Sequence, residues 1–268
     1  MRSITSIGQY YPGDSSIHRL DPRLKIALVL AFLAAVFLIE NFAGFALVGA
    51  ALLLVVRISR IPARWMLRSL RPLTFIVLLT MLLHSLRLTG SAGDPLVALG
   101  PVKIVSSGLV SGFFFSLRLV LLVAGSSLLT LTTTPVRLAD ALESMLRPLA
   151  RFGLPAHELA MMMTVALRFI PTLVEETDRI MKAQMARGAD FESGNLVRRA
   201  RSYVPLLVPL FVSIFRTADE LAVAMEARGY RGGEGRTRLH ELRVTPLDWR
   251  LTAASAVLLT AVVAVGRL

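Results

Sequence analysis

Residues 109–131 read L-V-S-G-F-F-F-S-L-R-L-V-L-L-V-A-G-S-S-L-L-T-L, an apolar run that a single charged residue, Arg118, interrupts. A helix needs about 20 predominantly apolar residues to cross the hydrocarbon core of a bilayer. This run is long enough to cross once, and Arg118 is tolerated there only if it pairs with a carboxylate or reaches the interface. We therefore expect a membrane-spanning helix in this part of the chain.

Four more apolar runs lie on either side of this one, at residues 24–39, 42–56, 73–83 and 251–265. Only Glu40 and Asn41 separate the first two, which therefore predict a tight helical hairpin. The whole chain is apolar as well: its mean hydropathy is +0.64, and 54% of its 268 residues are hydrophobic. A water-soluble core of this size cannot bury so many apolar residues. We predict an all-α, polytopic membrane protein with about five transmembrane helices.

The chain is also strongly basic, with 30 Lys and Arg residues against 18 Asp and Glu, a formal charge of +12. In a soluble protein such an excess would suggest a nucleic-acid partner. Here the cations follow the apolar runs instead, and the Glu40–Asn41 turn and the loop at 89–102 carry none. They gather before or at the start of the first run (Arg2, Arg19, Arg23 and Lys25) and after the second (Arg57, Arg60, Arg64, Arg68 and Arg71). We therefore expect the lipid bilayer, and no nucleic acid, as a partner.

This distribution of charge also predicts the topology, because cytoplasmic loops carry an excess of Lys and Arg. The N-terminus and residues 135–250 are expected in the cytoplasm and the C-terminus outside, in a multi-pass protein of the cell (plasma) membrane. We predict three parts: residues 1–134 with the N-terminal segment and four transmembrane helices, residues 135–250, and a C-terminal transmembrane helix at 251–268. The middle part is too long for a connecting loop.

The middle part has the pattern of long amphipathic helices. Thr134 and Pro135 suit a helix start, and Gly153 an end. A second helix is expected from about 156 to 187 and a third from about 203 to 228, each apolar in its first half and charged in its second. Three prolines are candidate hinges, with static kinks as the alternative: Pro171, Pro205 and Pro209.

The second and third of these helices end in the same tripeptide. Residues 183–188 read A-Q-M-A-R-G and residues 224–229 read A-M-E-A-R-G. One interpretation is local, since Gly often ends a helix and Arg is favourable in the last turn. The other is functional: each Arg is an exposed cation held rigidly at a helix end, where it can make bidentate contacts to carboxylates of a partner. The candidate site residues are Ala186, Arg187, Gly188, Ala227, Arg228 and Gly229.

Motifs for catalysis are missing from the sequence. There is no Cys for thiol chemistry or disulfides, and the four His residues show no H-x-x-x-H spacing for a metal site. G-x-S-x-G, H-E-x-x-H and the G-x-x-x-x-G-K-[ST] nucleotide loop are absent too. We therefore expect a non-catalytic protein with no catalytic residues, metal or cofactor of its own. A secondary transporter or channel working without ATPases is the alternative, although Arg118 is the only obvious ionisable residue inside a span.

Several blocks of sequence, in order, resemble the transmembrane T component of energy-coupling factor (ECF) importers, the CbiQ/EcfT family. They are Y-Y-P-G-D-S-S-I-H-R-L-D-P-R at 10–23, T-L-T-T-T-P at 130–135, L-R-F-I-P-T-L at 167–173, A-Q-M-A-R-G-A-D-F at 183–191, and A-M-E-A-R-G-Y at 224–230 with R-T at 236–237. The resemblance covers most of the chain. It fits best the general T component that several vitamin importers share.

The resemblance implies a scaffold and coupling subunit of an ECF-type ABC importer. Such a subunit joins two cytoplasmic ATPase subunits, A and A′, to a membrane-embedded substrate-binding S component. ATP binds to the ATPases, and its hydrolysis moves the coupling helices and drives uptake of vitamins or other micronutrients. The Arg of each signature, here Arg187 and Arg228, would dock into a groove on one ATPase.

Overall fold

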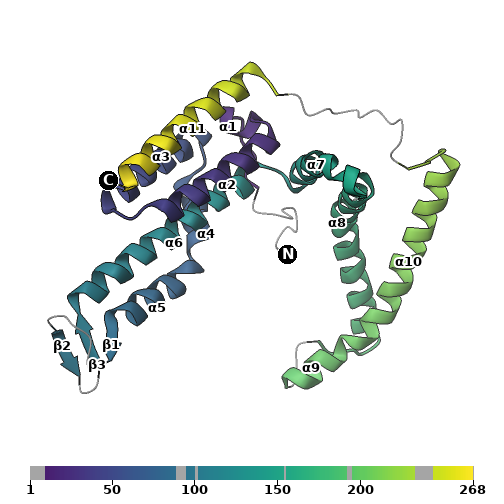
Figure 1. Ribbon diagram of the computed structural model, residues 1–268. Coiled ribbons are helices and arrows are strands. Elements are labelled where there is room, and N and C mark those ends of the chain that lie inside the picture. Colours follow the sequence, from purple (N-terminus) through teal and green to yellow (C-terminus); the bar gives the residue numbers. More distant parts are fainter. Residues whose placement is uncertain are drawn as a thin grey trace. The chain divides into compact units, whose positions relative to one another are not determined.

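The computed structural model describes residues 10–88, 95–99, 102–153, 155–191, 195–232 and 244–267 (Figure 1). The described residues fall into two compact units. Residues 10–141 and 244–267 form the first, which we call the membrane unit, and residues 142–232 form the second, which we call the amphipathic unit. Each unit is described by itself.

All five predicted apolar runs form helices in the membrane unit. Its helices are α1 (Ser16–Arg19), α2 (Pro22–Leu38), α3 (Phe42–Ser59), α4 (Ala63–Leu70), α5 (Leu73–Ser85), α6 (Ser106–Thr132), the first part of α7 (Pro135–Leu146) and α11 (Pro246–Arg267). The predicted hairpin is confirmed, because α2 ends just before Glu40 and Asn41 caps α3 by accepting a bond from the Gly44 amide at 2.7 Å. Helix α6 packs against α2, α3, α4 and α5 and is therefore the central helix of this unit.

The core of the membrane unit lies where the α2–α3 hairpin meets α6 and α11. Its buried side chains are Val36, Ile39, Phe45, Val48, Leu121 and Val262. Helices α3 and α11 approach closely here, because a Cβ at Gly44 would lie 2.9 Å from the Gly266 Cα. Many large apolar side chains on the outside are exposed, such as Leu53 at 66% and Phe75 at 71%. Such a surface is unusual in water and suits contact with lipid.

By length and composition, four described helices can cross a membrane: α3, α6, α11 and α8 (Ala156–Ala186) of the amphipathic unit. The pair α4 and α5, bent by 53°, makes a fifth if it counts as one span. The predicted total of about five spans agrees with this result, but the helices that make up the five differ from those predicted. Helix α2 has only 17 residues, whereas α8 has 31 and an apolar first half.

A small sheet between α5 and α6 was not expected from the sequence, which predicts only a loop here. Strands β1 (Leu86–Leu88), β2 (Pro95–Leu99) and β3 (Val102–Val105) are antiparallel in the order β1-β3-β2. Leu86 lies opposite Ile104, and Leu88 lies opposite Val102. Figure 1 shows the sheet beyond the ends of α5 and α6, so it extends a helical hairpin and leaves the all-helical class intact.

The amphipathic unit contains the long helices that the sequence predicts. After the end of α7 come a 3-10 turn at Arg147–Phe152, α8, α9 (Leu196–Ser202) and α10 (Val204–Ala227). Helix α8 packs against α10. Figure 1 shows the two helices meeting near α9 and separating away from it.

The candidate hinge prolines occupy two kinds of position. Pro171 lies inside α8 and Pro209 inside α10, where each removes one helical hydrogen bond. Pro205 is the second residue of α10, a place where a missing N–H leaves no helical bond unmade. Two of the three prolines therefore interrupt helical hydrogen bonding, and both a hinge role and a static kink stay predictions.

Candidate functional site

The first candidate site is the C-terminal end of α8, residues Ala186–Gly188, which we call the first tip. Arg187 is the C-cap residue, directly after the last helical residue Ala186, and Gly188 follows with a φ of +88°. The Gly188 amide donates to the Met185 carbonyl at 2.9 Å, and the Ala189 amide donates to the Gln184 carbonyl at 3.0 Å. These two bonds form a Schellman motif, which satisfies carbonyls that the helix end would otherwise leave unpaired.

The second candidate site, the end of α10 at Ala227–Gly229, has the same construction, and we call it the second tip. Arg228 ends the helix, and Gly229 has a φ of +72°. The Gly229 amide donates to the Glu226 carbonyl at 2.9 Å, and the Tyr230 amide donates to the Met225 carbonyl at 3.0 Å. The repeated tripeptide thus produces one backbone motif twice.

Both tip arginines are exposed, and the described part of the chain gives neither of them an ion pair. Other arginines of the same helices are paired: Arg179 with Glu176 at 3.4 Å in α8, and Arg216 with Glu220 at 3.0 Å in α10. A planar guanidinium with five donors is suited to bidentate contact with a carboxylate. Each tip therefore presents a cation, on a fixed backbone, that is available to a partner.

The two tips lie far apart within the amphipathic unit. Phe191, just after the first tip, is buried and its ring packs 5.3 Å from that of Tyr203, the residue before α10. The Arg199 side chain of α9 donates to the Phe191 carbonyl at 3.0 Å and holds this connection. The first tip is thus fixed near the start of α10, and the second tip ends it. A 24-residue helix is about 36 Å long at 1.5 Å per residue, so one small groove cannot receive both tips.

The apolar halves of α8 and α10 remain largely uncovered. On α10 the exposed apolar side chains recur three or four residues apart, which places them on one face of the helix: Val204, Leu207, Val208, Phe211, Val212 and Phe215. On α8 the same spacing relates Leu159, Met162 and Met163. We call these residues the apolar stripe. An exposed apolar face of this kind, here on each of the two helices, marks a surface for protein or membrane contact.

Two of the family-like blocks, 10–23 and 130–135, meet in the structure, and the sequence did not predict this contact. The buried Lys25 ammonium donates to the carbonyls of His18 at 3.3 Å and Thr132 at 3.1 Å, and to the Thr133 hydroxyl at 3.1 Å. It thereby caps the end of α6, because a cation near a helix C-terminus is favourable. This cluster fixes the point at which α7 begins.

Arg118 does not pair with a carboxylate among the described residues, and the alternative that it reaches the membrane interface stays a prediction. Its guanidinium donates to the Ile39 carbonyl at the end of α2, at 2.7 Å. Its carbon Cζ also lies 5.2–5.9 Å from the ring centroids of Phe37, Phe45, Phe114 and Phe115. A backbone carbonyl and aromatic faces, in place of a carboxylate, therefore compensate this charge.

Among the described residues, no three His, Asp or Glu side chains lie close enough to hold a metal ion. His157 and Glu143, whose side chains are 3.2 Å apart, join α8 to the end of α7. This contact links the two helices at the entry to α8.

Comparison with known proteins places this geometry in a family. The model of the CbiQ family, described as cobalt transport protein, matches residues 13–239. The chain belongs to this family. The stretch includes both tips, residues 130–135 and most of the block at 10–23, so the resemblance seen in the sequence is confirmed.

Three relatives are energy-coupling factor transporter transmembrane proteins, EcfT. The protein of Thermosediminibacter oceani is 55% identical over 266 residues, 99% of this chain and 97% of its own length. That of Acidaminococcus fermentans is 56% identical over 88% of this chain and 87% of its own. That of Bacillus subtilis is 51% identical over 94% of each. Together with the apolar helices of the membrane unit, these relatives support a transmembrane component of a transporter.

Proposed function

We propose that this CbiQ/EcfT family member is the scaffold and coupling subunit of an ECF-type importer. It would join two cytoplasmic ATPase subunits to a substrate-binding S component, so that ATP hydrolysis drives uptake of vitamins or other micronutrients. The subunit itself would be non-catalytic and bind no cofactor, since ATP would bind to the ATPases. The observation that carries the proposal is the pair of identical helix tips, each with one exposed arginine.

The tips suit two equivalent partners because they are equal in construction and separate in space. Each Schellman motif fixes the backbone of its arginine, so little conformational freedom is lost when the guanidinium binds. A groove lined with carboxylates on an ATPase would accept such a side chain in a bidentate arrangement. We expect Arg187 to dock on one ATPase and Arg228 on the other.

The apolar stripe suits the S component. An S component embedded in the membrane presents apolar helices, and an apolar stripe on α8 and α10 would bury against them or against the bilayer surface. Met162 and Met163 are flexible side chains that adapt to different partners. Pro171 lies between the stripe residues of α8 and the first tip, and Pro209 lies within the stripe of α10; bending at these points would carry movement of the ATPases to the S component.

The proposed placement puts the N-terminus and the amphipathic unit in the cytoplasm and the C-terminus outside. The positive-inside distribution of Lys and Arg supports it. The first half of helix α8 is apolar enough to enter the bilayer. Its charged second half would keep the first tip in the aqueous phase of the cytoplasm.

Copurification tests this function. The tagged full chain is extracted gently from its native membrane, and all accompanying proteins and small molecules are identified. We expect two ATPase chains or two copies of one, together with a small apolar membrane protein that carries a micronutrient. If the purified chain without any ATPase catalyses uptake into liposomes, it is a secondary transporter or channel and the proposal is wrong.

A further inference from the structure

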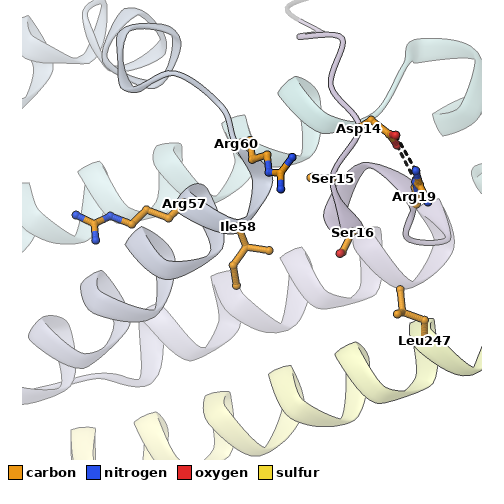
Figure 2. Close-up of a pocket in the computed structure, with 8 residues that line it drawn as sticks. All are labelled: Asp14, Ser15, Ser16, Arg19, Arg57, Ile58, Arg60 and Leu247. Carbon is orange, nitrogen blue, oxygen red and sulfur yellow. Dashed lines mark hydrogen bonds and ion pairs between the residues drawn. The ribbon is translucent and has the colours of Figure 1, made fainter.

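A positively charged pocket lies in the membrane unit between α1, α3 and the start of α11. Its volume is about 500 Å³. Arg19, Arg57 and Arg60 line it, together with Asp14 and the exposed hydroxyl-bearing Ser16. Figure 2 shows Asp14 and Arg19 joined to each other, by two bonds of 2.6 and 2.7 Å, so their charges cancel. The net charge of the pocket therefore comes from Arg57 and Arg60.

These two arginines have no ion pair within the part of the chain that the structure describes. In Figure 2 the Arg60 side chain reaches toward the segment with Asp14 and Ser15, whereas Arg57 extends away from it along α3. Arg60 is thus the central cation of the pocket, and Arg57 adds positive charge at its edge.

The backbone of Arg60 is unusual. Its φ is +55°, and no other non-glycine residue of the described chain has a positive φ. This left-handed conformation ends α3. Glycine adopts it without strain, whereas a residue with a Cβ atom adopts it at an energetic cost. Glycine would therefore suit the backbone better. A strained residue that persists points to use of its side chain.

An apolar cavity adjoins this basic pocket, and Ile58 of α3 lines both. The cavity has a volume of about 290 Å³ and lies between α2, α3, α6 and α11, with Leu28, Val55, Leu128 and Leu258 among its walls. This size is near the lower end for small-molecule sites, about 300 Å³. Its polar lining residues are few, and one of them, Lys25, already donates three hydrogen bonds.

We propose that these two hollows together bind one anionic phospholipid. The phosphate would lie against Arg60, with Ser16 as a further donor and Arg57 as supporting charge, and an acyl chain would enter the apolar cavity. The occupant carries both an anion and an apolar chain because the site presents both surfaces side by side. A free phosphate would leave the apolar cavity empty, and a zwitterionic lipid would gain little from two unpaired arginines.

The full chain, purified with the subunits that accompany it, tests this site by native mass spectrometry. Phosphatidylglycerol and phosphatidylcholine with the same acyl chains are titrated in detergent, and retained lipid is counted. Arg60→Gly is the decisive variant, because the backbone angle suits glycine and the fold should be as stable as before or more stable. We expect it to lower retention of phosphatidylglycerol about fivefold, the usual contribution of one basic residue near an anionic lipid.

Three controls test whether lipid retention depends on this pocket. Arg68→Gln removes a basic residue from the amphipathic α4 and should leave retention unchanged. Arg60→Lys keeps the charge and should retain most of the lipid. Inorganic phosphate at millimolar concentration should not displace the lipid. Equal retention of the two lipids, full retention by Arg60→Gly, an equal loss with Arg68→Gln, or displacement by phosphate would each overturn the proposal.

Discussion

Gly188 and Gly229 fix the directions of the two arginines by single backbone angles. Each has a positive φ, and a Cβ built on either glycine would have no atom within 4 Å. The requirement for glycine is therefore conformational and not steric. The two Ala-Arg-Gly tripeptides could be predicted from the sequence, because a helix stop is a local signal. The Arg repeated before each Gly then related the two helix ends to each other.

We predict that Gly188→Ala destabilises the end of α8 by about 1–2 kcal/mol, the cost of a left-handed conformation with a Cβ. Gly188→Asn should cost less, because Asn tolerates this conformation better. Hydrogen exchange of the amides of residues 184–189 measures the effect. Identical exchange in Gly188→Ala and the unchanged protein would show that the glycine conformation is not needed.

His18 is buried at the membrane-unit end where Lys25 lies, and burial lowers its pKa below the ordinary value of 6.5. Its Nε2 faces the Tyr11 carbonyl at 3.2 Å and must donate there, so in the neutral ring Nδ1 accepts from the Ser15 hydroxyl at 2.7 Å. The unfolded chain takes up a proton more readily than the folded one. The contribution of neutral His18 to the stability of the folded state is therefore complete above about pH 6.5. It is lost as the pH falls through the lower pKa that His18 has in the folded state.

Acidification from pH 8 to pH 5.5 should accordingly lower the melting temperature of the full chain. His18→Gln should show a smaller drop over the same range, since glutamine does not titrate. Thermal unfolding of both proteins in the same detergent provides the comparison. Equal drops would contradict a neutral, buried His18.

At the scale of elements, the sequence predicted most helix bounds because their signals are local. Thr134 and Pro135 open α7, and α8 and α10 end at the repeated tripeptides, where the sequence predicts a helix stop. The small sheet was not predicted, because its strands are too short to show a clear alternation of apolar and polar residues. The contacts of Lys25 and Arg118 were not predicted either, since their partners lie 107 and 79 residues away.

Replacing Arg118 tests how the central helix α6 holds the α2–α3 hairpin. Arg118→Met leaves the Ile39 carbonyl without its donor, and we expect a loss of about 2 kcal/mol, typical for a bond to a charged group. Arg118→Lys should recover part of the loss. Denaturant or thermal unfolding in detergent measures both. An unchanged stability of Arg118→Met would mean that the aromatic rings alone support this region.

At the scale of the whole molecule, one chain carries an apolar membrane unit and an amphipathic unit with two separated cationic tips. The net charge of +12 therefore has several causes. Part of it accompanies the membrane helices, part lines the basic pocket, and two residues, Arg187 and Arg228, end the helices that we propose to couple ATP hydrolysis to uptake. The transported substrate could not be predicted, because under the proposed function it would bind to the S component and not to this chain.

The central claim is that the two tips transmit force from the ATPases. The direct measurement is ATP-driven uptake by the complete complex in liposomes, with Arg187→Glu and Arg228→Glu combined. The control combines Arg179→Glu and Arg216→Glu, which reverse two exposed arginines of the same helices away from their ends. Charge reversal should repel the carboxylates of both ATPase grooves and lower uptake more than tenfold, whereas the control should remain near normal. Normal uptake by the double tip variant would contradict the proposed coupling.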